Sequence, residues 1–294
     1  MQLFKDARYF QILFQCSFLG YGIFYLDWKA GWGIYATYLA VSLTTQIMAE
    51  IIVSKIKYHK RPSIQRIKGG LPSAIISSLG LCLLLKTNSF TIAALAAFAS
   101  IASKYLIRIR GKHIFNPSAL GIVVAVWFTR EAWISPGQWG SNTVILFGVI
   151  CLGVIVVTKV QKLDISLAFL GTFAGLLFLR QVVYLGWPPD YFLQSLSTGS
   201  LLIFSFFMIT DPKTTPDHPL ARILWGMAVA GIAFYLTAFR FVNGAPIWVL
   251  IGMQTMVPLL DLLFKSNRFA WKHSTLVDGN ESHLLNAVYN HSIM

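Results

Sequence analysis

The stretch GKHIFNPSALGI, residues 111–122, decides the fold, because a basic run passes through an Asn-Pro step directly into an apolar segment. Asn116 suits the N-cap of a helix, since its side chain can accept a hydrogen bond from a free backbone N–H. Pro117 suits the first helical position, where its missing N–H costs nothing. The sequence therefore predicts a helix that begins at Asn116–Pro117, at the boundary between a charged surface and an apolar layer.

The composition indicates that this apolar layer is a membrane. The chain has 294 residues, of which 56% are hydrophobic and 12% are charged, and its mean hydropathy is +0.64. A soluble domain carries about 25% charged residues. A soluble fold of this composition would leave much of its apolar surface in water, so we predict a polytopic all-α membrane protein.

The hydropathy pattern divides the chain into apolar segments of the length that a spanning helix needs, about 17–25 residues, or slightly less. We predict ten transmembrane helices, near residues 10–27, 33–54, 70–86, 89–107, 116–129, 142–158, 164–183, 195–210, 220–239 and 245–264.

The basic residues alternate between the two sides of these segments. Of the 24 Lys and Arg residues, all but Lys29, Lys86, Arg130, Arg180 and Arg240 fall in the N-terminus and in every second connection. Because cytoplasmic loops are enriched in Lys and Arg, the pattern predicts a multi-pass protein of the bacterial inner membrane with both termini in the cytoplasm. The net charge of +13 is then explained by membrane orientation and by attraction of the basic loops to anionic lipids of the bilayer. No nucleic-acid partner is expected.

Ten segments divide into five plus five, and an odd number per half makes the second half enter from the opposite face. This topology is that of two inverted five-helix repeats, whose ligand sites lie where the halves meet. We predict one membrane domain over 1–272, with halves of about 1–130 and 131–272, and a polar cytoplasmic tail over 273–294. The small, polar openings GGLPSAIISSLG (69–80) and SLSTGSLLIFSFF (195–207) mark corresponding places; they suit either a binding site or close helix packing.

Ionisable residues inside the segments are few. Glu50 and Asp261 lie near segment ends that carry the basic loops, where pairing with a nearby cation would account for them, and Arg180 lies near an opposite end, where it can snorkel. The histidines fall in connections or the tail, so paired haem ligands are not expected, and no metal site is predicted. Nucleotide-binding and hydrolase motifs are absent from the sequence.

Four stretches occur in an order that resembles the NqrB/RnfD family, the membrane subunits of the sodium-pumping NADH:quinone oxidoreductase and of the Rnf electron-transport complex. They are SAIISSLGLCLLL (73–85), GKHIFNPSALGIVV (111–124), LSTGSLLIFSFFMITDPKTTP (196–216) and APIWVLIGMQTMVPLLDLLF (245–264). The resemblance covers about residues 68–265. It implies ten helices in two inverted halves, similar to urea transporters, and a place among other membrane or peripheral redox subunits.

The resemblance also implies a flavin cofactor, either FMN joined to a threonine or non-covalent riboflavin. By motif, the candidate flavin-binding residues fall in three groups: Asn116, Pro117 and Gly121; Thr198, Gly199 and Ser200; and Thr210, Asp211 and Pro212.

One departure separates this chain from the family pattern. Family members carry the flavinylated threonine in a long insertion between helices five and six, whereas that connection here is TREAWISPGQWGSN (129–142), with no Ala-Thr step. The chain therefore resembles a shortened RnfD form, and we expect a non-covalent flavin, either riboflavin or FMN.

Three functions are compatible with the sequence. The first is flavin-linked electron transport as one member of a complex, since the chain has neither an NAD fingerprint nor a cysteine cluster and is not expected to act alone as an oxidoreductase. The second is a small-solute channel or transporter on the same scaffold, and the third is a scaffold for partner subunits. Fold analogy alone does not choose between them.

Overall fold

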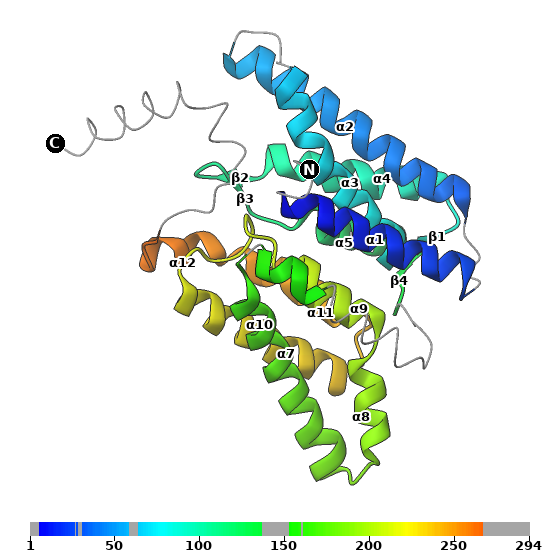
Figure 1. Cartoon of the computed structure of the whole chain (residues 1–294), viewed down its shortest axis with the longest axis vertical. Coiled ribbons are helices and arrows are strands. Elements are labelled where there is room, and N and C mark those ends of the chain that lie inside the picture. The colour runs from blue at the N-terminus through cyan, green and yellow to red at the C-terminus, as the bar shows by residue number, and fades with distance from the viewer. Residues whose placement is uncertain are drawn as a thin grey trace, which may run out of the picture.

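The computed structural model describes residues 6–26, 28, 31–58, 64–136, 153–159 and 161–266. This part of the chain is mostly helical (Figure 1). Four of its helices are long and apolar enough to cross a membrane, and six spans result if each of two bent helix pairs is counted as one. An all-α membrane fold is thus confirmed, while ten spans and an inverted repeat stay predictions.

The first half of the chain forms one group of helices, in the upper part of Figure 1. Its members are α1 (Ala7–Phe24), α2 (Trp32–Tyr58), α3 (Ile64–Leu84), α4 (Phe90–Leu106) and α5 (Pro117–Thr129). The helices α2, α4 and α5 pack in sequence, and α3 contacts α1, α2 and α5. Small residues such as Ala93, Ala96 and Ala97 are fully buried on α4, as expected where membrane helices approach closely.

Two short antiparallel strand pairs lie at opposite ends of this group. Strand β1 (Leu85–Thr87) continues α3 and pairs with β4 (Ala132–Ile134), which follows α5. Strands β2 (Arg108–Ile109) and β3 (Lys112–His113) form a hairpin before α5. The hairpin turns at Arg110 and Gly111, whose φ angles are 52° and 83°, and a glycine takes such an angle without strain.

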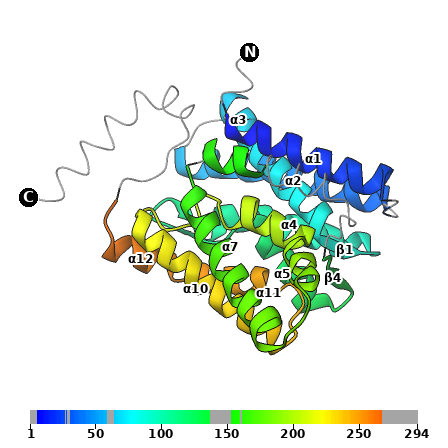
Figure 2. The ribbon, with the colours of Figure 1, turned by 60° about the horizontal axis from the view of Figure 1, so that its bottom comes forward.

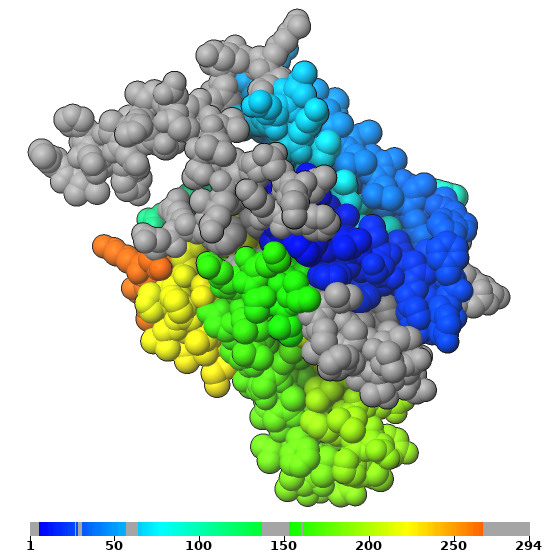
Figure 3. Space-filling model, in the orientation of Figure 1, coloured from blue at the N-terminus to red at the C-terminus, as the bar shows by residue number. Residues whose placement is uncertain are grey.

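The second half lies in the lower part of Figure 1. A helix covers 153–159. It is followed by α7 (Leu163–Phe178) with its π-helical continuation η2 (Leu179–Tyr184), α8 (Pro189–Leu196), α9 (Gly199–Ile203) with the π-helix η3 (Phe204–Met208), α10 (Pro219–Ala238), α11 (Ala245–Gln254) and α12 (Val257–Leu263). The chain bends by 51° between α8 and α9–η3 and by 49° between α11 and α12. The far end of α7, η2 and α8 project from the body (Figure 3).

The ends of the molecule differ in chemistry. We call the end that holds the β2–β3 hairpin, the 209–218 loop and α12 the basic end, and the end that holds β1 and β4 the strand end; they lie on opposite sides in Figures 1 and 2. Between them, aromatic residues of both halves meet. The rings of Phe18 and Phe207, one from each half, lie 6.3 Å apart, and Phe207 belongs to the same π-helix as Phe204, whose ring lies 4.9 Å from that of Phe169 in the second half.

The predicted segments agree with the helices in most places. The segment predicted over 142–158 lies largely outside the described residues, and the predicted tail over 273–294 lies wholly outside them. The segment predicted over 245–264 is two helices rather than one, because the helical path breaks at Thr255 and Met256.

Candidate functional site

Asn116 is one of the residues that join the two halves of the chain. It is the N-cap of α5, and its Oδ1 accepts hydrogen bonds from the Ala119 N–H at 3.1 Å and the Ser118 hydroxyl at 2.9 Å. Its Nδ2 donates to the Met208 carbonyl at 3.2 Å, and its backbone N–H donates to Gln254 Oε1 at 2.9 Å. The predicted helix start at Asn116–Pro117 is confirmed, and both polar atoms of the Asn116 side chain are used inside the protein.

Gln254, the last residue of α11, carries an unused hydrogen-bond donor. Its side chain is fully buried, and its Nε2 has no partner in the described part of the protein. The orientation of the amide follows from its neighbour: the Asn116 N–H is a donor, so the oxygen must face it and the NH2 must point elsewhere. A buried donor without an acceptor costs about 1–3 kcal/mol, so this group is suited to a ligand carbonyl.

α5 and α11 run antiparallel beside each other. The start of α5 meets the end of α11 through Asn116 and Gln254, and at the strand end Asn243 Nδ2, just before α11, donates to the Ile134 carbonyl at 3.2 Å. Both helices begin with Pro in their first turn. The pair therefore links the basic end to the strand end through the centre of the molecule.

Gly121 serves this packing rather than a pocket. A Cβ placed on it would lie 2.5 Å from the Ala96 carbonyl oxygen and 3.0 Å from Ser100 Cβ. Only glycine lets α5 approach the α4 backbone so closely.

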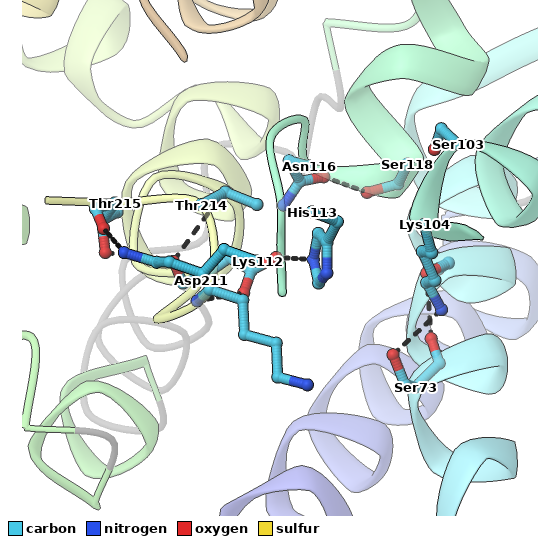
Figure 4. Close-up of polar contacts among 12 residues, drawn as sticks. Ser73, Ser103, Lys104, Lys112, His113, Asn116, Ser118, Asp211, Thr214 and Thr215 are labelled. Atoms are coloured by element: carbon cyan, nitrogen blue, oxygen red, sulfur yellow. Dashed lines mark hydrogen bonds and ion pairs between the residues drawn. The ribbon is translucent and has the colours of Figure 1, made fainter. Parts of the chain in front are cut away.

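The TDP motif lies next to the Asn116 junction. Thr210 is buried, and its hydroxyl donates to the Phe206 carbonyl at 2.6 Å. The Asp211 Oδ1 accepts from the Lys213 N–H at 3.1 Å, while Oδ2 lies 3.7 Å from Nε2 of His113 on β3. Pro212 is buried behind this turn. Figure 4 shows His113 directed at Asp211, with Asn116 on the same side.

The charges of this pair depend on each other. Burial lowers the pKa of His113 below its usual value, and the Asp211 carboxylate only partly opposes this effect. Burial acts to raise the pKa of Asp211, but contact with His113 and the Lys213 N–H outweighs it and holds this pKa below its usual range. Near neutral pH the pair is therefore a carboxylate beside a half-buried imidazole.

The third predicted group lies elsewhere. Thr198, Gly199 and Ser200 form the start of α9, where the Ser200 N–H donates to the Pro136 carbonyl at 3.0 Å. Helices α9 and η3 separate this group from the TDP motif, so it belongs to the strand end. The structure brings Asn116 next to the segment that leads into the Thr210 group, whereas Gly121 faces α4 and the Thr198 group lies apart from both.

Lys112, which the sequence marks only as a topology signal, organises the basic end. Its Nζ lies 2.9 Å from Asp217 Oδ1 and 2.8 Å from Asp261 Oδ2, and it donates to the Thr215 carbonyl at 3.0 Å. The sequence predicts a cation partner for Asp261 and for Glu50. In the structure, Asp261 pairs with Lys112, and Glu50 pairs with Arg66, 3.0 Å away. The sequence near Lys112 does not indicate these contacts, because Asp261 is 149 residues away in the chain.

A cavity of about 140 Å³ opens beside this cluster. Its lining comes from the β2–β3 hairpin, the 209–218 loop and α12, and comprises Ile109, Arg110, Lys112, His113, Ile114, Lys213, Asp217, Val257, Pro258, Asp261, Lys265 and Ser266. The lining comes within three residues of Asn116 along one segment and of Gln254 along the other. Gln254 itself is fully buried and is not among the residues that line the cavity.

More charge is buried nearby. Arg222 of α10 pairs with Asp164 at the start of α7 and donates to the Asp217 carbonyl at 3.1 Å. Burial, with the adjacent Arg222, lowers the pKa of Lys162 to about 8. In the first half of the chain, the Lys104 ammonium of α4 donates to the Ser73 hydroxyl of α3 at 2.9 Å (Figure 4). Within the described residues, no cluster of three or more His, Cys, Asp or Glu side chains could hold a metal ion.

Comparison with known proteins gives a consistent result. Residues 130–270 match the NQR2, RnfD, RnfE family. A protein of Shewanella amazonensis, described as the D subunit of an ion-translocating oxidoreductase complex, is 28% identical over 151 residues, which cover 50% of this chain and 39% of that protein. A protein of the same description from Pseudomonas paraeruginosa is 25% identical over an alignment 298 positions long. This alignment covers 82% of this chain and 85% of that protein. The resemblance to the NqrB/RnfD family is therefore confirmed.

Proposed function

We propose that this chain is the RnfD-like membrane subunit of an ion-translocating oxidoreductase complex. The proposal is supported by the family match over residues 130–270, by the description of both relatives as members of such a complex, and by helices of membrane-spanning length. Its partners are other membrane or peripheral redox subunits, and it lies in the bacterial inner membrane with its basic end toward the cytoplasm. The family match gives no support to the channel alternative.

We further propose that the protein holds a flavin without a covalent bond, at the junction of Asn116, Gln254, His113 and Asp211. The observation that carries this proposal is the fully buried Gln254 Nε2, a fixed donor without an acceptor among the described residues. The pyrimidine edge of a flavin ring presents carbonyl oxygens that such a donor can bind. When bound, a flavin supplies one- and two-electron redox chemistry that amino-acid side chains lack.

The residues of the junction would bind and orient the ring. Gln254 would donate from Nε2, and its own orientation is fixed by the Asn116 N–H. Asn116 keeps the two halves in register by its bond to the Met208 carbonyl. The Thr198 group, at the strand end, would keep a structural role in the bend between α8 and α9.

The antiparallel α5–α11 pair supports an inverted-repeat arrangement for the whole chain. Helix five of each proposed half begins with a proline in its first turn, and the two helices run in opposite directions. A ligand at their meeting point would contact both halves, as expected for repeat proteins of this kind.

The test is purification in mild detergent, followed by an absorbance spectrum and mass analysis of the extract after denaturation. We expect a yellow protein that releases free flavin on denaturation. The Gln254→Leu variant should retain much less flavin. Gln46→Leu is the matched control, because Gln46 is also buried but lies on α2 and bonds Tyr105. A colourless wild-type protein, or equal flavin loss in both variants, would contradict the proposal.

A further inference from the structure

Lys162, the residue before α7, is a buried cation without a direct partner. Only 3% of its surface is exposed, and its ammonium group has no hydrogen bond or ion pair among the residues that the structure describes. Its main charged neighbours are two cations, Lys112 and Arg222, and two carboxylates, Asp164 and Asp217. Each carboxylate already binds one of the two other cations. Since a buried charge without a partner is unfavourable, the position suits a lysine only if an anion joins it.

Lys162 also stands at the N-terminus of a helix, where a cation is unfavourable. It is the N-cap of α7, a position that favours Ser, Thr, Asp and Asn because their side chains accept a hydrogen bond from the first turn. A lysine side chain accepts none, and this N-cap makes no side-chain hydrogen bond. The first-turn N–H groups give a helix start a partial positive charge, which repels Lys162 and attracts an anion. The Asp164 carboxylate in the first turn offsets part of this charge but is shared with Arg222.

A second helix start lies beside the first. The helices α7 and α10 pack side by side (Figures 1 and 2). They run in the same direction, because Asp164 binds Arg222 near their starts and the rings of Phe173 and Phe234 lie 6.4 Å apart further along. The N-cap of α10 makes no side-chain hydrogen bond either, and the helix begins with a proline. The partial positive charges of both helix starts therefore meet at the basic end, next to Lys162.

The surface beside these helix starts is apolar. Leu167 in α7 and Leu220 and Leu224 in α10 are exposed, and all three lie within the first two turns of their helices. Exposed leucines on a membrane helix face lipid chains, which are as apolar as leucine itself. A phospholipid whose chains cover these leucines has its phosphate level with the two helix starts. The four-carbon stem of Lys162 can turn its ammonium group toward that level.

We propose that the paired starts of α7 and α10 bind the phosphate of an anionic phospholipid, with Lys162 as its cation. Phosphate groups bind readily at helix N-termini, where backbone N–H groups and the helix dipole both favour an anion. Basic pockets between membrane helices bind anionic lipid head groups in the same way. The inference goes beyond the proposed flavin function and does not depend on it, because different residues form the two sites.

The test measures how lipids change the melting temperature. The full-length protein is purified in mild detergent, freed of bound lipid, and heated with phosphatidylglycerol, with phosphatidylcholine of the same chain length, or with inorganic phosphate. We expect phosphatidylglycerol to raise the melting temperature by about 3–6 °C at about ten times its dissociation constant, because a ligand that binds only the folded state stabilises it by mass action. Phosphatidylcholine, whose choline compensates the phosphate charge, and inorganic phosphate should each give a rise of less than about 1 °C.

Substitutions of lysine locate the effect. Lys162→Met removes the charge and keeps much of the side-chain length, so the melting temperature without lipid should stay equal or rise, since a buried charge without a partner is lost. The rise with phosphatidylglycerol should disappear in this variant. Lys162→Arg keeps the charge and should retain the rise. Lys55→Met, at an exposed lysine of α2, is the matched control for the loss of one positive charge and should also retain it.

Three results would overturn the lipid site. The first, which needs only the wild type, is no rise with phosphatidylglycerol or an equal rise with phosphatidylcholine. The second is a phosphatidylglycerol effect that survives Lys162→Met. The third is a rise with inorganic phosphate as large as that with phosphatidylglycerol, which would assign the helix starts to a free anion instead. None of these results bears on the flavin junction, which the absorbance spectrum of the purified protein tests separately.

Discussion

At the scale of single residues, Asn116 combines three tasks that are usually divided among several side chains. It caps α5, bonds the end of η3 and orients Gln254. Because the bonds run to segments 92 and 138 residues away, they join the halves as well as starting a helix.

The substitution Asn116→Ala tests this combination. Loss of the cap alone costs about 1 kcal/mol, and the Met208 carbonyl would lose a buried partner at a further cost of about 1–3 kcal/mol. We expect a clearly lower melting temperature in detergent. Asn116→Ser, which keeps a capping oxygen, should recover part of the loss.

Asn243→Ala is the control for Asn116→Ala. It removes one bond, to the Ile134 carbonyl, at the strand end. A loss of stability as large as that of Asn116→Ala would show that Asn116 has no special role.

His113 makes the stability of the protein depend on pH. Burial depresses its pKa from the usual 6.5, so the unfolded chain binds a proton more readily than the folded protein does. Stability should therefore fall as the pH drops through about 6.5 toward the folded-state pKa. The groups facing His113 are Asp211, Lys213 and Lys104.

The check is the melting temperature at about pH 8 and about pH 5.5, for the wild type and for His113→Gln. The wild type should lose a few degrees more than the variant over this interval. An identical pH dependence in the two proteins would assign the effect to other groups.

The residue-scale features differ in how far the sequence predicts them. The N-cap at Asn116 is local, since its acceptor and donors lie within three residues, and its prediction is confirmed. The contacts of Lys112 join positions more than 100 residues apart, and no local pattern specifies which acid meets which base. The unused Gln254 donor is likewise visible only once the two halves are in contact.

At the scale of elements, the close approach of α5 to α4 depends on one glycine. In Gly121→Ala the new methyl group would meet the Ala96 carbonyl and Ser100, and the helices would have to separate. We expect a loss of about 1–3 kcal/mol, as for other overpacked sites, measured as a lower melting temperature.

Gly231→Ala is the matched control for this effect. Gly231 lies within α10, and a Cβ there meets nothing within 4 Å. This substitution should leave stability unchanged or raise it by about 0.5–1 kcal/mol, because alanine loses less backbone entropy in a helix. A destabilised Gly231→Ala protein, or an unchanged Gly121→Ala protein, would contradict the packing described for α5.

The helix breaks show where sequence patterns stop being informative. The run over 245–264 is apolar throughout, so hydropathy predicts one span, yet the chain bends by 49° after Gln254. Pro258 is the second residue of α12, where it suits a helix start, and it is a local signal for the break. Strands β1 and β4 have three residues each, too few for an alternating pattern to identify.

At the scale of the whole molecule, the two halves form separate helix groups joined along α5 and α11, with opposite chemistry at the two ends. The basic end combines the Asn116 junction, the Lys112 cluster and the cavity. The strand end carries β1, β4 and the start of α11. Composition and charge alternation predict a membrane protein with a basic face, but the pairing of α5 with α11 requires the fold.

The orientation of these ends is the claim on which the proposed function depends, and cysteine labelling tests it most directly. In a chain with its own cysteines replaced, single cysteines at exposed Lys55 and Lys265 and at exposed Glu131 and Arg240 are treated in intact cells with a reagent that does not cross the membrane. The positions of Glu131 and Arg240 should react from outside, whereas those of Lys55 and Lys265 should react only after the cells are opened. Labelling of Lys55 or Lys265 from outside would place the basic end and its candidate site on the wrong side of the membrane.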